Sequence, residues 1–342
     1  MPLIMENNAL NKNGAIDLVV PWVDDQDEAW RERRSRFLPE NGSDLHEARY
    51  RDWGLLRYQF RGFEKYSPWV RKIWFVTDCR LPDWLNTGHP KLEIVDPNAL
   101  LPADCVPTFN INAIELNLHR IPGLSEQFIY FNDDMYLLRP TEETDFFLNG
   151  LPRDSASLSP VIVTKRKDVG SIQVNDMCLI NQHFTRRQVL FTNPWLWFDP
   201  LYGSQLFRTL CLLPWRHLPG FYNHHLPQPF LKSTFQEVWE KEEAALREVT
   251  GHRFRNYYSD LNQWLFRYWQ LCSGRFSPAP TGRGLYITAD DTEKTCRLIQ
   301  RQKHLFLCIN DADEISDISA YREKIGEAFE SILPERSSFE LF

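Results

Sequence analysis

The stretch Phe128–Asp134 reads FIYFNDD, an apolar run that changes abruptly into one amide and two adjacent carboxylates. The apolar half predicts a buried strand, so Asn132, Asp133 and Asp134 lie where that strand ends. Oxygen ligands in such a place suit a hard divalent cation of the kind that holds a diphosphate. An isolated Asp-Asp pair is more often a solvated turn, and the rest of the chain decides between the two interpretations.

Three earlier apolar runs have the same character. Residues 16–23 (IDLVVPWV), 72–77 (KIWFVT) and 91–95 (KLEIV) each predict a short strand followed by an aspartate. Strands that alternate with helices predict a mainly parallel sheet that is covered on both faces. The intervening segments with helical character are residues 27–37, 52–65 and 110–120.

Aspartates gather at one edge of this predicted sheet. The carboxyl ends of parallel strands meet at the same edge, and ligands of such sheets bind there. Carboxylates crowded together repel one another unless a cation neutralises them. This geometry favours a metal site over a solvated turn. The aspartates concerned are Asp24, Asp25, Asp78, Asp133 and Asp134.

The pattern changes beyond residue 140, where the chain becomes rich in Trp, Pro and Phe. Closely spaced prolines predict that residues 214–229 (PWRHLPGFYNHHLPQP) form a loop throughout. Helical character returns at residues 233–249 and 259–272, and Ser259 is the N-cap candidate of the second helix.

Arg253 and Arg255 stand just before that second helix. The positive end of a helix dipole and two guanidinium groups together suit a phosphate, which predicts a phosphate cradle. Solvated arginines with local salt bridges explain the same residues equally well at this point.

We expect an α/β fold in which a mainly parallel, Rossmann-like (GT-A-like) sheet carries a smaller, mostly helical second lobe. The change of pattern sets the predicted boundaries. Residues 1–140 form the core, residues 141–303 the second lobe, and residues 304–342 a strand and a helix that return to the core.

The composition argues against some classes of function. A net charge of −7, from 39 basic and 46 acidic residues, argues against a general nucleic-acid binder, which must neutralise phosphates. The seven cysteines are scattered without a CxxC pair, which is typical of reduced thiols in a cytosolic protein. The N-terminus lacks the basic and apolar regions of a signal peptide, and no apolar run is long enough to span a membrane. We therefore expect a cytoplasmic protein, and peripheral attachment to a membrane stays open.

Four blocks of the sequence, in the same order, resemble the conserved regions of the Stealth family. That family includes bacterial capsular polysaccharide phosphotransferases and the animal lysosomal-enzyme N-acetylglucosamine-1-phosphotransferase. Together the blocks cover most of the chain. They are IDLVVPWVDD at 16–25, the long block at 49–134, HLPQPF at 225–230 with residues 252–274, and CIND at 308–311 with LPERSSFE at 333–340.

The resemblance implies a hexose-1-phosphate transferase. Such an enzyme moves hexose-1-phosphate from a UDP-sugar to a hydroxyl of a glycan, forms a phosphodiester and releases UMP, in capsular or cell-surface polysaccharide synthesis. It implies Mg²⁺ or Mn²⁺ as the cofactor and a glycan or lipid-linked glycan as the acceptor. Association with the inner face of the membrane or with a capsule-assembly complex also stays open.

The resemblance assigns catalytic roles to a few residues. Asp133 and Asp134 match the metal-binding NDD, together with Asn132. His225 is the candidate general base on the acceptor hydroxyl, since an imidazole titrates near neutrality. Arg255 would stabilise charge on the transferring phosphoryl group.

The matched blocks also imply a set of donor-binding residues. Trp22, Val23 and Asp24 would line the nucleotide pocket. The arginines that match the second block would meet phosphate, and Asp52 would hold them in place. The donor-binding residues expected outside the metal site are Trp22, Asp24, Arg49, Asp52, Arg57, Asn110 and Glu115.

Other interpretations remain at this stage. His225 could hydrogen-bond a backbone carbonyl, and Asp52 and Glu115 could be structural partners of nearby arginines. A conventional metal-dependent glycosyltransferase would use the same diphosphate site but release UDP. A non-catalytic carbohydrate-binding protein would explain the aromatic content of 14%. The released nucleotide separates these classes.

Overall fold

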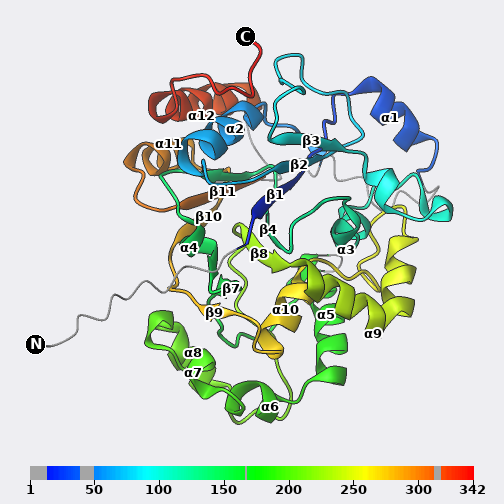
Figure 1. The fold of residues 1–342 in the computed structure, drawn as a ribbon, viewed down its shortest axis with the longest axis vertical. Coiled ribbons are helices and arrows are strands. Elements are labelled where there is room, and N and C mark those ends of the chain that lie inside the picture. Colours follow the sequence, from blue (N-terminus) through cyan, green and yellow to red (C-terminus); the bar gives the residue numbers. More distant parts are fainter. Residues whose placement is uncertain (1–13, 39–49, 166–167, 312–316) are drawn as a thin grey trace, which may run out of the picture.

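A five-stranded sheet in the order β3-β2-β1-β4-β8 lies at the centre of the molecule (Figure 1). The computed structural model describes residues 14–38, 50–165, 168–311 and 317–342. The first four strands are parallel and β8 is antiparallel to β4. The strands are β1 (Ile16–Pro21), β2 (Ile73–Val76), β3 (Leu92–Val95), β4 (Gln127–Tyr130) and β8 (Gln228–Leu231).

The central strands are buried on both faces, which is why they read as continuous apolar runs. Side chains alternate across the sheet, so neighbours in one strand enter different cores. Val19 packs into the core that contains Trp239 and Trp269, whereas Leu18 packs into the one that contains Phe60. The sheet therefore lies between two hydrophobic cores and contributes side chains to both.

Helices from distant parts of the chain cover the two faces. On the Phe60 side lie α2 (Leu56–Tyr66) and α12 (Ile318–Ile332), and α11 (Thr292–Arg301) packs on α12. The opposite core is built by the helices α3 (Ile111–Leu116), α5 (Val169–His183), α9 (Lys232–Thr250) and α10 (Trp264–Cys272).

Two small sheets flank the main one. In the first, β11 (Phe306–Asn310) pairs with β10 and runs antiparallel to β5 (Met135–Leu137), so Cys308 lies opposite Met135. This pairing brings β11 beside the NDD turn. The other elements of these sheets are β10 (Gly284–Thr288), β6 (Phe147–Leu148), β7 (Leu151–Asp154) and β9 (Ser277–Pro278).

Short helices complete the described chain. Three of them, α6, α7 and α8, form one end of the molecule in Figure 1. Within the described ranges, no helix combines the length and the apolarity that crossing a membrane would require. The short helices are α1 (Glu28–Ser35), α4 (Glu143–Phe146), α6 (Arg186–Phe191), α7 (Pro194–Trp197) and α8 (Gln205–Cys211).

The α/β class and the mostly parallel main sheet are confirmed, but the prediction of a loop throughout residues 214–229 is wrong. Gln228 and Pro229 belong to β8, where Pro229 pairs with Ile129. A proline cannot donate to a strand ladder, and β8 tolerates one because it is the last strand of the sheet.

The N-cap prediction for the second helix is also wrong. Helix α10 begins at Trp264, with Gln263 at its N-cap position, so Ser259 lies in the preceding turns. Arg253 donates from Nε to the carbonyl of Pro107 at 2.9 Å, and its guanidinium lies 4.3 Å from the ring centre of Phe37. The predicted phosphate cradle of paired arginines at a helix N-terminus is therefore not formed.

A buried ion pair joins α10 to β7. Arg267 donates from Nε and Nη2 to the two carboxylate oxygens of Asp154 at 2.7 and 2.8 Å, and both side chains are almost fully buried. Burial alone would raise the pKa of Asp154, but the Arg267 guanidinium holds that pKa below its usual value. The pair therefore stays charged inside the protein.

We expect Arg267→Met to lower the free energy of unfolding by about 3–5 kcal/mol, because it leaves the Asp154 carboxylate buried without its cation. The matched control is Arg247→Met, since Arg247 binds both oxygens of Asp104 but the two side chains are 47% and 70% exposed. That control should change stability by less than about 1 kcal/mol. Urea unfolding of both variants measures the contrast, and equal losses would contradict it.

Candidate active site

The NDD turn and the proline-rich segment meet at the carboxyl edge of the main sheet. Because β8 is antiparallel to β4, with Gln228 opposite Tyr130, the residues before β8 lie beside those after β4. His225 Nε2 is 3.4 Å from Asn132 Nδ2 and 4.0 Å from Asp134 Oδ2. Three residues expected in the catalytic site are therefore close together.

The backbone of His225 has a φ of +44°, which is uncommon for a residue with a side chain. Such conformations persist only where the surrounding structure enforces them. Here the imidazole also packs edge-on against Tyr286, with 5.5 Å between the ring centres. The loop thus holds this imidazole toward the NDD turn.

Two residues that the sequence interpretation did not assign hold the NDD turn in place. The thiol of Cys308 donates to Asp134 Oδ2 at 3.2 Å. Gln59 donates from Nε2 to the carbonyls of Asn132 and Met135, both at 2.8 Å. The CIND block was a signal for Cys308, and a glutamine among the apolar residues of a predicted helix was a signal for Gln59.

Burial and neighbouring negative charges destabilise the ionised carboxylates of the turn. Burial raises the pKa of Asp133 well above its usual value, and the charges of Asp134 and Asp52 raise it further. Burial also raises the pKa of Asp134, although the nearby His225 opposes this. Moreover, Asp134 Oδ1 is buried and has no hydrogen-bond partner among the residues that the structure describes. A cation would satisfy that oxygen and relieve the repulsion, so these residues fit a metal ion.

One group of potential ligand atoms lies within 4.8 Å of one another, and it comprises Asp134, His225 and Cys308. Burial, together with the charge of Asp134, raises the pKa of the Cys308 thiol well above its usual value. The thiol therefore stays protonated and donates to Asp134 instead of binding a hard cation as a thiolate. The oxygens of Asp133 and Asp134 are the better ligands for Mg²⁺ or Mn²⁺.

A second acidic group surrounds the end of β1. The indole of Trp22 donates to Asp52 Oδ1 at 3.3 Å, and the backbone N–H of Asp52 donates to Asp25 Oδ1 at 3.4 Å. Burial raises the pKa of both Asp52 and Asp25, and the charge of Asp24 adds to each shift. Since Asp52 also acts on Asp133, the two acidic groups form one negative region.

Asp78, the remaining aspartate that was predicted at the carboxyl edge of the main sheet, pairs with an arginine of α1. Arg33 Nη2 lies 3.1 Å from Asp78 Oδ2 and also donates to the Asp78 carbonyl. Asp78 is therefore neutralised from α1 within the protein.

The arginines near Asp52 differ from the expectation. Arg49 lies outside the described residues, and the Arg57 guanidinium lies 5.3 Å from the ring centre of Trp84. Instead, Arg322 donates to the Asp52 carbonyl at 2.5 Å. Arg51 binds both carboxylate oxygens of Asp311 at 2.9 Å, which links the second and fourth sequence blocks.

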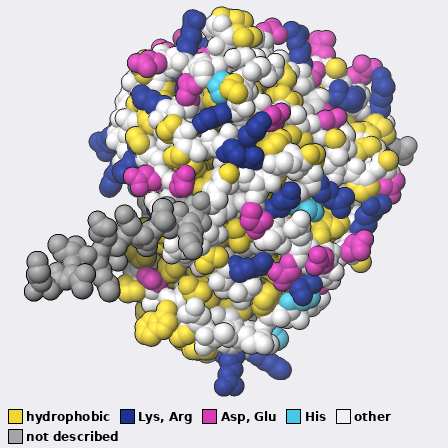
Figure 2. All heavy atoms as spheres, in the orientation of Figure 1, with side chains coloured by type: hydrophobic (Ala, Val, Ile, Leu, Met, Phe, Trp, Pro, Cys, Tyr) yellow, Lys and Arg dark blue, Asp and Glu magenta, His cyan; other side chains and the backbone are white. Residues whose placement is uncertain are grey.

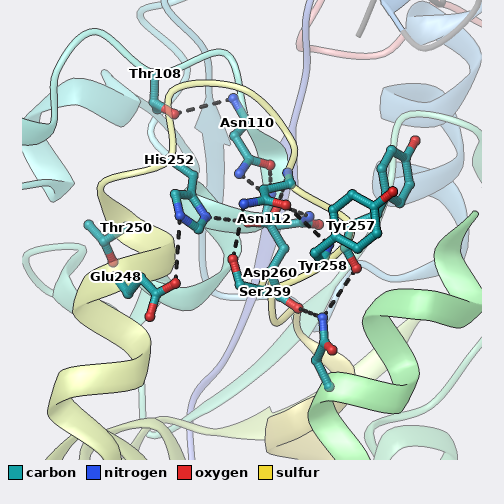
Figure 3. A network of polar contacts seen from close by, with 12 residues as sticks. Thr108, Asn110, Asn112, Glu248, Thr250, His252, Tyr257, Tyr258, Ser259 and Asp260 are labelled. Atoms are coloured by element: carbon teal, nitrogen blue, oxygen red, sulfur yellow. Dashed lines mark hydrogen bonds and ion pairs between the residues drawn. The ribbon is translucent and has the colours of Figure 1, made fainter. Parts of the chain in front are cut away.

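Asn110 belongs to a buried polar network around Asp260 (Figure 3). The fully buried Asp260 carboxylate accepts from Asn110 Nδ2 at 3.0 Å and from Asn112 Nδ2 at 2.9 Å. It also accepts from His252 Nδ1 at 2.6 Å and from the Asn256 N–H at 2.9 Å. These bonds fix the loop between α9 and α10, which carries Arg255.

Glu115 is the buried neighbour of this loop. It accepts from the Tyr130 hydroxyl at 2.6 Å and from the Gln263 N–H at 3.4 Å. Burial raises the pKa of Glu115 to about 7, and the charge of Arg255 opposes the rise. Among the contacts of the described residues, Asn110 belongs to the Asp260 network and Glu115 bonds to Tyr130 and Gln263, and neither side chain contacts the NDD turn.

We expect the pH dependence of stability to change in Glu115→Gln. The folded pKa of about 7 lies above the ordinary value of 4.5, so the stabilisation from the neutral acid is complete below about pH 4.5 and is lost as the pH rises to about 7. The glutamine cannot ionise. Relative to the wild type, its free energy of unfolding should therefore rise by on the order of 3 kcal/mol between pH 4.5 and 7 and then level off. Urea unfolding at several pH values tests this, and parallel curves would contradict it.

Comparison with known proteins bears on this site. Residues 49–154 match the model of Stealth protein CR2, conserved region 2. The capsular polysaccharide phosphotransferase WcwK of Streptococcus pneumoniae is 40% identical over 333 residues, which cover 95% of this chain and 99% of the relative. This chain belongs to the Stealth family. The matched region contains the NDD turn, Asp52 and Asn110.

Other similar proteins are also named as polysaccharide phosphotransferases. The receptor polysaccharide phosphotransferase WefC of Streptococcus oralis is 41% identical over 334 residues, covering 95% of this chain and 99% of the relative. The exopolysaccharide phosphotransferase cps2G of Lactiplantibacillus plantarum is 38% identical, covering 95% of this chain and 96% of the relative.

The repulsion in the NDD turn gives a test of metal binding that needs no activity assay. Without added cations, Asp133→Asn should raise the melting temperature, because it removes one of two partly buried carboxylates that repel each other. Mg²⁺ or Mn²⁺ should stabilise the wild type and stabilise Asp133→Asn much less. Differential scanning fluorimetry with and without EDTA measures both effects. Asp290→Asn is the matched control, since Asp290 also belongs to an Asp-Asp pair but is exposed. An equal cation response in all three proteins would exclude a metal at this turn.

Proposed function

We propose that this protein transfers hexose-1-phosphate from a UDP-sugar to a hydroxyl of an acceptor glycan and releases UMP, in the synthesis of a capsular or other cell-surface polysaccharide. Membership of the Stealth family, with full-length relatives named as phosphotransferases, makes it an enzyme that transfers phosphorus-containing groups. The observation that carries the proposal is the contact between the NDD turn and His225. It places a carboxylate pair that would bind a cation beside an imidazole that would accept a proton, at one sheet edge.

The metal and donor sites would lie side by side. Asp133 and Asp134, with Asn132, would hold Mg²⁺ or Mn²⁺. The ion would neutralise the donor diphosphate when bound. Trp22 and Asp24 at the end of β1 would line the nucleotide pocket of a GT-A-like core.

The remaining assignments extend the donor site. Asp52 would hold the pocket in shape through its bond to Trp22. Asn110 and Glu115 would act through the loop that carries Arg255, since Asn110 donates to Asp260 in that loop and Glu115 accepts from the Gln263 N–H at its end. Arg49 and Arg57 remain candidates for phosphate contact. Residues 1–140 would then bind the donor, and residues 141–303 the acceptor.

In the proposed reaction the acceptor hydroxyl oxygen attacks the β-phosphorus of the UDP-sugar. The new bond is the P–O bond of a phosphodiester, and the bond that breaks joins the β-phosphorus to the bridging oxygen, which leaves with UMP. His225 takes the hydroxyl proton. Arg255 stabilises charge on the transferring phosphoryl group, a role that its guanidinium suits.

The product nucleotide tests the proposal. The protein is incubated with individual UDP-sugars, Mg²⁺ and an oligosaccharide acceptor, and the nucleotide is identified by chromatography. UMP with a phosphodiester-linked product supports the proposed transfer. UDP would identify a conventional glycosyltransferase, and glycan binding without turnover of any UDP-sugar would identify a carbohydrate-binding protein.

We expect His225→Ala to reduce transfer by roughly 10²–10⁴-fold, the usual contribution of a general base. His217→Ala is the matched control from the same proline-rich segment, because that imidazole is exposed. His224 is less suitable: it is partly buried, its buried Nδ1 has no hydrogen-bond partner within the described ranges, and burial lowers its pKa to about 3.

The cation response of the same variant separates two roles for His225. If it is the base, His225→Ala keeps the stabilisation by Mg²⁺ or Mn²⁺ seen in the wild type. Loss of that stabilisation would make His225 a metal ligand instead. Unchanged transfer would remove it from the mechanism.

A further inference from the structure

The end of the molecule formed by α6, α7 and α8 carries large apolar side chains on its surface. Trp195 is 81% exposed, Phe207 73% and Trp215 56%. Soluble monomers rarely expose several such side chains from one short segment. Phe191 and Leu210 are each half exposed in the same region. The four rings and one leucine lie within 25 positions of the sequence.

Local packing accounts for this exposure. Other side chains of these helices are buried: Val189 and Leu190 of α6 and Trp197 of α7 belong to the core. Arg186 of α6 donates to the carbonyl of Leu213, which ties the segment before Trp215 to α6. The short helices thus bury one apolar face and present a second one outward.

The segment is also basic in an acidic protein. Residues 184–218 contain four arginines, no lysine and one acidic residue, Asp199, so their net charge is 4 − 1 = +3, whereas the whole chain carries −7. Three of the arginines, Arg187, Arg208 and Arg216, are exposed. Figure 2 shows hydrophobic and basic side chains together at this end of the molecule.

We propose that this surface docks on an anionic lipid bilayer. Tryptophan prefers the boundary between acyl chains and headgroups, where its ring is apolar and its N–H finds a partner. Arginines beside such rings bind the phosphates of anionic lipids. We call the surface the lobe face and define it by eight residues: Phe191, Trp195, Phe207, Leu210, Trp215, Arg187, Arg208 and Arg216.

Charge complementarity favours a bilayer over other occupants. A twofold dimer formed through the lobe face would place the same arginines of two copies against each other. A neutral glycan would use the rings but leave the three arginines without counter-charges. An anionic bilayer uses both kinds of side chain, and its surface is broad enough to meet all of them at once.

Vesicle sedimentation tests the proposal. The full-length protein is mixed with vesicles of phosphatidylcholine alone or of phosphatidylcholine with phosphatidylglycerol. We expect binding to the anionic vesicles that is at least tenfold stronger and weakens with salt. Trp195→Ser with Phe207→Ser, and separately Arg187→Gln with Arg208→Gln and Arg216→Gln, should each reduce it at least tenfold.

The matched controls are Phe342→Ser and Arg80→Gln, since these side chains are also well exposed but lie outside the lobe face. Both should bind like the wild type. Equal loss in the controls, or unchanged binding in the lobe-face variants, would overturn the proposal. Binding that is equal for neutral and anionic vesicles would overturn it as well.

A second measurement does not depend on the stability of the variants. Brominated lipids should quench part of the tryptophan fluorescence of the wild type, and Trp195→Phe should reduce the quenched fraction. Absence of quenching would overturn the proposal. So would a dimer in light scattering that the lobe-face variants abolish, because the surface would then be a contact between two copies. Vesicle binding is measured without a sugar donor, a metal ion or any transfer reaction. Its outcome therefore tests the lobe face independently of the proposed reaction.

Discussion

Strand β8 runs antiparallel to β4, with Gln228 opposite Tyr130 and Leu231 opposite Gln127. This register sets the distance between the proline-rich segment and the NDD turn, because both leave their strands at the same edge. A parallel β8 would have sent His225 to the opposite edge of the sheet. The candidate active site therefore depends on the direction of one edge strand. The positive φ of His225 then turns the chain so that its imidazole faces Asn132 and Asp134.

The acidic edge of the sheet illustrates a compromise between stability and function. Several carboxylates gather there, and the pKa values of Asp133, Asp134, Asp52 and Asp25 are all raised, chiefly by burial. A protein selected only for stability would not keep so many acids in one place. Hydrogen bonds from Gln59, Trp22 and Cys308 hold the groups despite their repulsion. A cation bound there would relieve this repulsion.

Much of the fold and of the candidate site was predictable from the sequence, and the predictions that were wrong have physical explanations. Apolar runs that end in an aspartate, or in Asn132 for the fourth run, predicted the four parallel strands, because burial on both faces removes polar residues from a strand. β8 was missed, since its proline is a signal against strands in general but is tolerated in the last strand of a sheet. Cys308 was missed as a partner of Asp134 because strand pairing across 174 positions has no local signal.

The predicted contacts of the arginines were wrong for a related reason. A guanidinium has many suitable partners, and the sequence does not say which one it meets. Arg253 bonds to the Pro107 carbonyl, and Arg57 lies over Trp84, whereas Arg51 and Arg322 are the ones near the acidic region. The helix boundary at Trp264 was missed because Asp260, and not Ser259, organises the turns before α10.

The pairing of β11 with β5 has a consequence for the order in which the protein is made. The NDD turn is synthesised 174 positions before Cys308, and β11 pairs with β5 only after that later segment has been made. Until then the carboxylates of the turn lack the thiol that donates to Asp134. A nascent chain that ends before β11 therefore carries this part of the site without one of its hydrogen-bond partners.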